Sequence, residues 1–398
     1  MTDRTILYTV AFLRALATGM IGVLLGIYLA RLDLGPSQIG VIIGLGLAGG
    51  AGAALVVTIF ADRFGRKRFL IALSIAGAAG GAAAAVASSP LLLGIASFFG
   101  MLNGMGRDRG AALVLDQAIL PATATASERT RAFAWYNVLQ DVGHALGGLM
   151  AGLPALLRNA AGLPEIASFR LTVGAYALLM LVTSVFYLRL SPRIEVDRAM
   201  PKHRLSPRSR RVLTKISSIF VLDSLGGGFL TSALVSYFFY ERFGVGVETL
   251  GPLFFGARIA NALSHLAAAR LARRFGLVNT MVFTHIPSSL LLVTVAWAPS
   301  FPIAAILFLL REGLVEMDVP TRQSYVIAMA RPEERTVASG VTNLVRMGAW
   351  AVAPSFAGMF MSGVSLATPL FAGAGLKIVY DVILYVSFRR LRPPEEIR

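Results

Sequence analysis

The sequence predicts an all-α integral membrane protein with twelve transmembrane helices in two pseudo-symmetric six-helix bundles. Three observations lead to this fold class. First, 56% of the 398 residues are apolar and only 15% are charged, a composition that leaves a soluble domain without a water-facing surface. Second, apolar runs long enough to cross a bilayer recur along the whole chain. Third, short motifs recur in the same order in both halves. These observations exclude a soluble enzyme, a disulfide-stapled secreted domain and, despite a net charge of +16, an ordinary nucleic-acid binder.

The helices of the first half are bounded by charged residues or by Pro and Gly turns. They are expected at residues 6–30, 38–60, 69–88, 91–118, 131–157 and 170–190. The first run, 6–30, follows the basic Arg4 as the apolar part of a signal peptide would. It is too long for that, contains Arg14 and has no small-residue cleavage site, so we expect it to be retained as the first helix.

A polar segment separates the two halves. It is rich in proline, arginine and lysine, which prevents it from spanning and indicates a linker. The helices after it are expected at 213–240, 249–270, 278–298, 302–328, 337–362 and 367–388. The predicted domains are an N-terminal six-helix bundle at 1–190, a cytoplasmic linker at 191–212 and a C-terminal six-helix bundle at 213–398.

The distribution of charge predicts the orientation in the membrane. About 25 basic and about 9 acidic residues fall on the two termini and the even-numbered connections, whereas the odd-numbered connections hold about 4 of each. Because Lys and Arg stay on the cytoplasmic side, we expect a multi-pass protein of the cytoplasmic membrane with both termini inside. The excess of basic over acidic residues then reflects membrane topology and contact with anionic lipids, and it indicates no nucleic-acid partner.

Motifs for covalent, metal or nucleotide chemistry are missing from the sequence. It has no cysteine, and its four histidines lack zinc-ligand spacing. It also has no G-x-x-x-x-G-K-S/T motif, so an ATP-driven pump would need another chain. We therefore expect no cofactor, no resident metal and no enzymatic activity, while transport of a metal cation stays open.

The two halves repeat in sequence. IFADRFGRKRFL at 59–70 matches RLARRFGLVNTM at 270–281. Shorter matches keep the same order, namely Gly40 with Gly251, SERT (127–130) with EERT (333–336), and Asn137 with Asn343. This order predicts a parallel repeat, and such repeats place a substrate site between the halves near the middle of the membrane.

Residues 61–68, ADRFGRKR, resemble the signature loop of the major facilitator superfamily, usually written G-x-L-A-D-R-x-G-R-K/R. With the twelve helices, the linker and the repeat, the resemblance covers essentially the whole chain and implies the major facilitator fold. It also implies gating roles for Asp62, Arg63 and Arg66, with the Asp62 carboxylate at the start of the eleventh helix, near 336–338. A carboxylate there would meet the positive end of the helix dipole. The basic residues of the loop also enforce topology.

Three positions depart from the family patterns. Thr58 occupies the leading glycine position of the loop motif, and Gly100 stands where a second motif has arginine. GHALGG, at 143–148 in the fifth helix, is close to the G-P-x-x-G-G antiporter motif of drug exporters but has His144 for proline. These departures weaken a drug/proton antiporter assignment, and the glycines are also compatible with simple close packing.

Charged residues inside the predicted spans are the strongest functional clues. A charge at the bilayer centre costs roughly 2.5–3.5 kcal/mol on insertion scales, so such residues face one another or water. In the transporters that this chain resembles, helices 1, 4, 7 and 10 line the cavity. Here they carry Arg14, Arg107, Asp108, Arg109, Asp223, Arg311, Glu312, Glu316 and Asp318. Arg14 and Asp223 lie at similar depths in counterpart helices, and we expect them to pair across the halves. The pair is either a salt bridge that fixes the packing of the bundles or a contact that forms in only one conformational state.

The tenth helix carries two carboxylates one turn apart, Glu312 and Glu316. Two carboxylates in one low-dielectric site cannot both ionise cheaply, so one proton is expected to be retained near neutral pH. This pair is the first candidate for a coupling-proton site, and Asp108 or Asp223 is the alternative. Neutralisation of the pair by the arginines of the fourth helix is the purely structural alternative.

Further polar residues recur at helical spacing. They form two stripes, Asn137, Asp141 and His144 on the fifth helix and Arg258, Asn261 and His265 on the eighth. These stripes are expected either to contact a substrate or to join helices by hydrogen bonds. On the twelfth helix, Lys377 and Asp381 are expected to pair locally.

The resemblance and the intramembrane charges together predict a secondary active transporter that moves a small organic solute by alternating access, with proton-coupled export favoured. An importer or facilitator of the same fold is the alternative, and a non-transporting membrane sensor or scaffold is the alternative from another class. The expected pathway residues are Arg14, Arg107, Asp108, Asp141, His144, Asp223, Arg258, Glu312 and Glu316. The expected partners are the solute, protons and membrane lipids, with the chain acting as a monomer.

Overall fold

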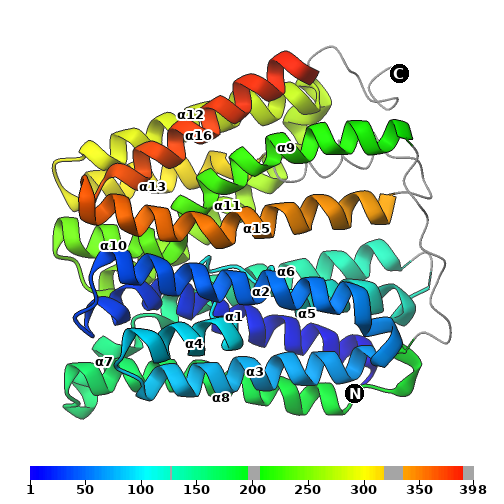
Figure 1. Ribbon diagram of the computed structural model, residues 1–398, viewed down its shortest axis with the longest axis horizontal. Helices are drawn as coiled ribbons and strands as arrows, with labels where there is room; N and C mark the ends of the chain where they lie inside the picture. The colour runs from blue at the N-terminus through cyan, green and yellow to red at the C-terminus, as the bar shows by residue number, and fades with distance from the viewer. Residues whose placement is uncertain (126–127, 196–206, 318–334, 389–398) are drawn as a thin grey trace. The chain divides into compact units, whose positions relative to one another are not determined.

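The computed structural model describes residues 1–125, 128–195, 207–317 and 335–388, and the regular elements in these ranges are helices (Figure 1). The first are α1 (Asp3–Ala30), α2 (Pro36–Phe64), α3 (Arg66–Val86), α4 (Pro90–Gly100), α5 (Ala111–Ile119), α6 (Arg129–Met150), α7 (Leu153–Ala161) and α8 (Glu165–Leu188). They are followed by α9 (Pro207–Phe229), α10 (Ser232–Phe243), α11 (Val247–Phe275), α12 (Leu277–Trp297), α13 (Phe301–Val315), α15 (Arg335–Gly363) and α16 (Thr368–Phe388). Short 3₁₀ turns lie at Leu120–Thr123 and Pro192–Ile194. The predicted all-helical membrane fold is confirmed.

Three of the expected spans are each divided into two helices. The expected helix 91–118 is broken between α4 and α5, where Met101 and Gly106 have φ angles of 52° and 68°. The sequence GMLNGMGRDRG across this break is rich in glycine, which weakens a helix, and two of its residues are left-handed. The other breaks lie at 151–152, between α6 and α7, and at 230–231, between α9 and α10.

The chain forms two compact units. Unit 1 combines residues 1–200, 231–255 and 354–362, and unit 2 combines 201–230, 256–353 and 363–398. In unit 1, α1 packs against α6, α8 and α10, and α3 packs against α4 and α8. The apolar part of α1 is 83% buried, so this helix lies at the core of unit 1.

Glycines bring α6 close to α1 within unit 1. A methyl group added at Gly143 would lie 2.7 Å from the carbonyl oxygen of Phe12 and 2.8 Å from the Cβ of Ala15. Gly147 faces Gly19 of α1 in the same way. The glycines of the GHALGG motif therefore serve close helix packing, and they determine which face of α6 meets α1.

Two further close contacts support the internal repeat. They join counterpart residues, Gly40 of α2 with Pro354 and Gly358 of α15, and Gly251 of α11 with Gly148 and Gly152. The alignment of the two halves maps one set of residues onto the other. Counterpart positions thus make counterpart contacts, as a parallel repeat requires.

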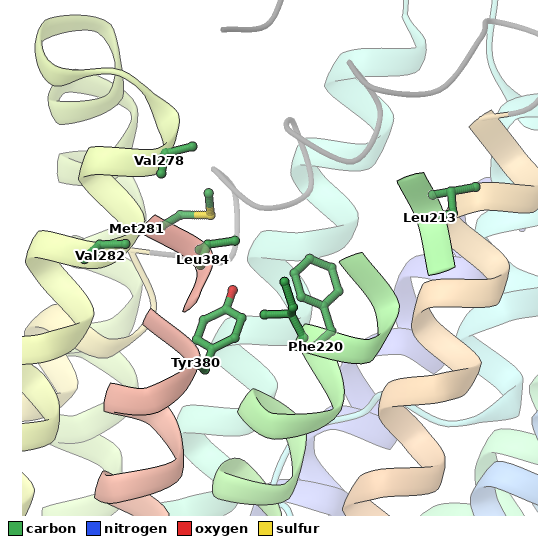
Figure 2. Close-up of a cluster of buried hydrophobic side chains, with 8 residues drawn as sticks. Leu213, Phe220, Val278, Met281, Val282, Tyr380 and Leu384 are labelled. Atoms are coloured by element: carbon green, nitrogen blue, oxygen red, sulfur yellow. The ribbon is translucent and has the colours of Figure 1, made fainter. Parts of the chain in front are cut away.

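The apolar core of unit 2 joins α9, α12 and α16 (Figure 2). It is built from Leu213, Ile219, Phe220, Val278, Met281, Val282, Tyr380 and Leu384, all buried. The ring centroids of Phe220 and Tyr380 are 6.3 Å apart, and Figure 2 shows the two side chains next to each other. This core joins the three helices that carry Asp223, His285, Lys377 and Asp381.

Candidate functional site

Unit 1 contains a buried polar cluster around Arg14 of α1. Arg14 is 4% exposed. Its Nε and Nη2 are each 2.9 Å from Oδ2 of Asp108, and Nη2 is 2.7 Å from Oδ2 of Asp116. Asp108 lies in the irregular segment between α4 and α5, and Asp116 lies on α5. We define the Arg14 cluster as Arg14, Asp108, Asp116, Tyr136, Gln140, His144 and Tyr187, all of which are buried.

Two tyrosines complete the surroundings of Asp116, which has no exposed surface. Tyr136 of α6 donates its hydroxyl to Oδ2 over 2.9 Å, and Tyr187 of α8 donates to Oδ1 over 3.3 Å. Arg14 also donates to both tyrosine oxygens, over 3.2 Å in the case of Tyr136. The guanidinium and the carboxylate are thus paired and shielded from the apolar surroundings, as buried charges must be.

The broken fourth span supplies a backbone donor to this cluster. The N–H of Asp108 has no helical partner and donates to Nε2 of His144 over 2.7 Å. Gln140 donates its amide to Oδ2 of Asp108 over 3.3 Å. Irregular backbone at membrane depth requires buried partners of this kind. Because Nε2 accepts, His144 is neutral in this arrangement and carries its proton on Nδ1.

The charges within the cluster do not balance. It contains one guanidinium and two carboxylates, so its formal charge is −1 when both carboxylates are ionised. An unbalanced buried charge is costly, so both carboxylates depend on the one guanidinium that they share.

Unit 2 contains a second buried cluster around Asp223 of α9. Lys377 of α16 donates to Oδ1 of Asp223 over 3.0 Å, and Arg346 of α15 donates to Oδ2 over 3.5 Å. Lys377 also lies 3.2 Å from Nε2 of His285, whose Nδ1 is 3.0 and 3.1 Å from the two carboxylate oxygens of Asp381. We define the Asp223 cluster as Asp223, His285, Arg346, Lys377 and Asp381.

The residues of two expected ion pairs have partners that their spacing does not predict. Arg14 and Asp223 are each bound by side chains of their own unit, and their pairing across the halves stays a prediction. Lys377 and Asp381, expected to pair locally on the last helix, both contact His285, which lies between them. Sequence spacing shows that two charges share a face, but the third side chain between them comes from α12.

Glu312 of α13 belongs to a smaller buried group in unit 2. It pairs with Arg311 and accepts a hydrogen bond from Asn261 of α11 over 2.9 Å, and Arg258 lies 3.4 Å from the amide oxygen of Asn261. α13 ends at Val315, so Glu316 lies at the helix end. Glu316 is the C-cap residue of α13 and keeps a right-handed helical backbone, so the expected neighbourhood of Glu312 and Glu316 stays a prediction. Asp318 and the side chain of His265 lie outside the described residues.

The polar face of α6 differs from the expected stripe. His144 is buried, but Asn137 and Asp141 are exposed. The buried polar face instead carries Tyr136, Gln140 and His144, at i, i+4 and i+8. The close packing at Gly143 and Gly147 selects this face, which helical spacing alone does not distinguish from its neighbour.

The loop between α2 and α3 is held by local contacts. Asp62 accepts from Nε of Arg66 over 2.8 Å, and its side chain is 48% exposed. The guanidinium of Arg63 lies over the ring of Phe64. α15 begins at Arg335, but the side chains of its first turn lie outside the described part of the chain, so the gating role of Asp62 stays a prediction.

The start of the linker is attached to this same loop. Glu195 accepts hydrogen bonds from the backbone N–H groups of Arg66 and Lys67 over 2.7 and 3.1 Å. These N–H groups belong to the first turn of α3, where a carboxylate is favoured. Lys67 in turn donates to the carbonyl oxygen of Leu190 over 2.7 Å. The loop thus binds the start of the linker through its backbone N–H groups and the side chain of Lys67.

Sequence analysis missed several members of the two clusters. These are Asp116, Tyr136, Gln140 and Tyr187 in unit 1, and His285 and Arg346 in unit 2. Asp116 carries a usable signal, because it is a second carboxylate in the same expected span as Asp108. The tyrosines carry none, because a tyrosine in an apolar span is common and its hydroxyl partner comes from another helix.

Comparison with known proteins agrees with this architecture. The sequence profile of the Major Facilitator Superfamily matches residues 7–354. The uncharacterized membrane protein YJR124C of Saccharomyces cerevisiae is 26% identical over 420 residues, a match that covers 97% of this chain and 94% of the yeast protein.

Several solved structures share the fold at low sequence identity. The nucleoside transporter NupG matches with a TM-score of 0.77 at 15% identity, over 98% of this chain and 100% of that one. The D-xylose-proton symporter matches with a TM-score of 0.72 at 14% identity, over 99% of both chains. A bacterial homolog of the human lysosomal transporter Spinster, inward-facing and occupied, matches with a TM-score of 0.72 at 16% identity, over 96% and 94%. At these identities the likeness shows the fold alone.

Proposed function

Since the chain belongs to the major facilitator superfamily, we propose that it is a secondary active transporter that moves a small organic solute across the cytoplasmic membrane by alternating access and couples this movement to protons. The family membership and the fold shared with solved transporters support the transporter class. Proton coupling is supported by one observation above all, the buried Arg14 cluster, in which two carboxylates share one guanidinium.

The proposed coupling works through the partners of Arg14. When both carboxylates are ionised, Arg14 of α1 is bound by Asp108 and Asp116 together. A proton on one of them removes its charge and leaves the guanidinium to the other. Because one carboxylate lies in the irregular segment and the other on α5, the proton changes which part of the fourth span is bound to α1. Binding of a proton thereby alters helix contacts, as coupling requires.

Glu312 is the second candidate for the coupling proton. It is 6% exposed and has partners of both kinds, the cation Arg311 and the amide of Asn261. A carboxylate with its own arginine is already balanced, so it has less need of a proton than the unbalanced pair in the Arg14 cluster. The other residues of the proposed pathway are Arg107, Asp141, His144, Asp223, Arg258 and Glu316.

Export is the proposed direction, driven by the inward proton gradient. The likeness of GHALGG in α6 to the antiporter motif of drug exporters supports export, although His144 stands at the proline position of that motif. The concentration of basic residues on one set of connections supports cytoplasmic termini. The proposed moving bodies are the bundles 1–190 and 213–398 of a monomer, joined by the linker 191–212, with Asp62, Arg63 and Arg66 at the gate.

Transport by purified protein in liposomes tests this function. A thermal-shift screen of nucleosides, sugars, organic anions and organic cations first selects the solute that stabilises the protein most. That solute, radiolabelled, is then offered to vesicles with an acidic lumen and to vesicles with an acidic exterior. Accumulation with an acidic lumen, abolished by a protonophore, is expected for a proton antiporter. Accumulation with an acidic exterior would overturn export in favour of symport, and equilibration alone would overturn coupling.

Matched carboxylate variants test the proposed proton site. Asp116→Asn should lose accumulation driven by the pH gradient and keep solute exchange at equal concentrations, because exchange needs no proton release. Asp33→Asn is the control, since Asp33 lies in an exposed turn with a φ of 61°, which asparagine also adopts. If Asp116→Asn and Asp108→Asn both accumulate solute as the control does, the coupling proton does not reside in the Arg14 cluster.

A further inference from the structure

We propose that His285 is a second proton-binding residue, separate from the Arg14 cluster, and that a proton on its Nε2 transfers Lys377 from His285 to Asp223. The proposal rests on the proposed transport function only for its role in the transport cycle. The protonation step itself follows from the geometry of the Asp223 cluster.

His285 is held between two side chains of α16 that are one helical turn apart. Its ring is 1% exposed. Nε2 lies 3.2 Å from Nζ of Lys377, and Nδ1 lies 3.0 and 3.1 Å from the two oxygens of Asp381. The ring of Tyr380 meets the imidazole edge to face, with the ring centroids 6.1 Å apart. Both ring nitrogens therefore have polar partners inside a dry environment.

The chemistry of the partners determines the tautomer. An ammonium group can only donate hydrogen bonds, and an ionised carboxylate can only accept them. Lys377 therefore donates to Nε2, and Nδ1–H of His285 donates to Asp381. The imidazole is neutral in this state, with its proton on Nδ1 and a lone pair on Nε2 that is directed at a cation.

The charges around His285 balance without a proton on Nε2. Among the residues that the structure describes, the charged side chains joined to it directly or through a shared partner include Lys377 and Asp381 on α16, Asp223 on α9 and Arg346 on α15. Their formal charges sum to zero. On α13, which also packs against α12, Arg311 and Glu312 pair with each other. A neutral His285 thus completes a neutral cluster.

A proton that reaches Nε2 makes the contact with Lys377 untenable. Both nitrogens would then be donors, and two positive charges would face each other about 3 Å apart in a low-dielectric site. Asp381 stabilises the imidazolium through Nδ1–H, and Asp223 offers Lys377 an acceptor that it already contacts over 3.0 Å. Lys377 therefore moves fully to Asp223. The step adds one proton and breaks one hydrogen bond, and no other bond changes.

This transfer changes which helices of unit 2 are joined. Without the proton, Lys377 links α16 to both α12 and α9. With the proton, Lys377 links α16 to α9 alone. The ion pair between His285 and Asp381 then strengthens the link from α12 to α16. Arg346, whose contact with Asp223 is the longer one at 3.5 Å, then competes with Lys377 for the same carboxylate. A proton on His285 thereby alters the contacts of α9, α12, α15 and α16 together.

His144 in unit 1 provides an internal comparison. Its Nε2 also accepts a hydrogen bond, but the donor is the backbone N–H of Asp108 at 2.7 Å. Lys377 can shift its hydrogen bond from His285 to Asp223. The backbone N–H of Asp108 is fixed and cannot shift in this way. His144 therefore serves as the internal reference for His285 in the titration below.

Nitrogen NMR on the full-length protein in lipid nanodiscs tests the proposal directly. With ¹⁵N-labelled histidine and lysine, His285 is assigned as the signal lost in His285→Gln, and His144 as the signal lost in His144→Gln. At pH 8, His285 should show the neutral Nδ1–H tautomer. On acidification to pH 5 it should become doubly protonated, and the ¹⁵N signal of Lys377 Nζ, lost in Lys377→Gln, should move in the same step. A neutral His285 throughout, or a Lys377 signal that does not move with it, would overturn the proposal.

Transport by the same variant separates this inference from the proposed function. His285→Gln should lower accumulation driven by the pH gradient at least tenfold and leave solute exchange within about twofold of the unmodified protein. If the unmodified protein transports nothing, the proposed function fails, and the NMR titration still decides whether His285 binds a proton. If the unmodified protein transports and His285→Gln accumulates solute equally well, the role of His285 in the cycle is refuted while the proposed function stands.

Discussion

Replacing Arg14 with glutamine should destabilise the protein more than the loss of any exposed arginine. The change removes the cation that Asp108 and Asp116 share, at 2.9 and 2.7 Å, and leaves both carboxylates buried. Removing one partner of a buried ion pair costs about 3–5 kcal/mol. At roughly 2–4 °C per kcal/mol for a unit of about 150–250 residues, the apparent melting temperature should fall by roughly 6–20 °C.

The matched control is Arg31→Gln at the end of the same helix. Arg31 also pairs with a carboxylate, Glu165, at 3.0 Å, but the two side chains are 36% and 37% exposed. An exposed pair is worth about 0–1 kcal/mol, so the melting temperature should change by a few degrees at most. Both variants are measured in the same detergent and at the same heating rate, because unfolding of such proteins is often irreversible.

A compensating variant tests the electrostatic explanation. Arg14→Gln combined with Asp116→Asn removes one positive and one negative charge, and the amide oxygen of the asparagine still accepts from one of the hydroxyls of Tyr136 and Tyr187. It should recover more than half of the stability lost in Arg14→Gln alone. Equal melting temperatures for Arg14→Gln and the Arg31 control, or no recovery in the double variant, would refute the reasoning that the two carboxylates depend on Arg14.

Three further predictions concern topology, gating and packing. Single cysteines introduced at Ser206 and Ala160 should react with a membrane-impermeant maleimide from opposite sides of intact cells, and labelling of both from outside would contradict the cytoplasmic linker. Asp62→Asn should slow turnover while the solute affinity and the melting temperature stay unchanged, because a surface carboxylate at a helix start is worth about 0.3–1 kcal/mol; unchanged turnover would remove Asp62 from the gate. Gly40→Ala should destabilise by about 1–3 kcal/mol, because its new methyl group meets the backbone of α15. Gly52→Ala on the same helix points into open space and should not destabilise, so equal effects would argue against the close contact.

The fold class follows from sequence composition and segment length. The thickness of the bilayer determines how many apolar residues a span needs, so twelve such runs predict the helices without any knowledge of their packing. Matches between the halves, such as Gly40 with Gly251, predict the repeat, and the structure places both glycines in counterpart contacts. The presence of functional charges inside the spans is also visible in the sequence, because a buried charge is costly enough to be kept for a reason.

The identity of the partners of those charges depends on tertiary structure. Helical spacing places Asn137 and Asp141 near His144, but the neighbouring face with Tyr136 and Gln140 is the one that α1 covers. Two faces offset by one residue differ by about 100° of helix rotation, and only the packing of the glycines between α1 and α6 selects one of them.

The break in the fourth span and the bridge through His285 depend on tertiary structure for the same reason. A helix interruption at membrane depth forms only where other helices satisfy the freed backbone groups, as His144 does for Asp108. Similarly, the one-turn spacing of Lys377 and Asp381 predicts a local pair, but it does not predict that both contact His285 of α12. The sequence determines which charged residues lie within the spans. Their pairing depends on how each helix is rotated and how closely it approaches its neighbours, and the packing of many side chains together determines both.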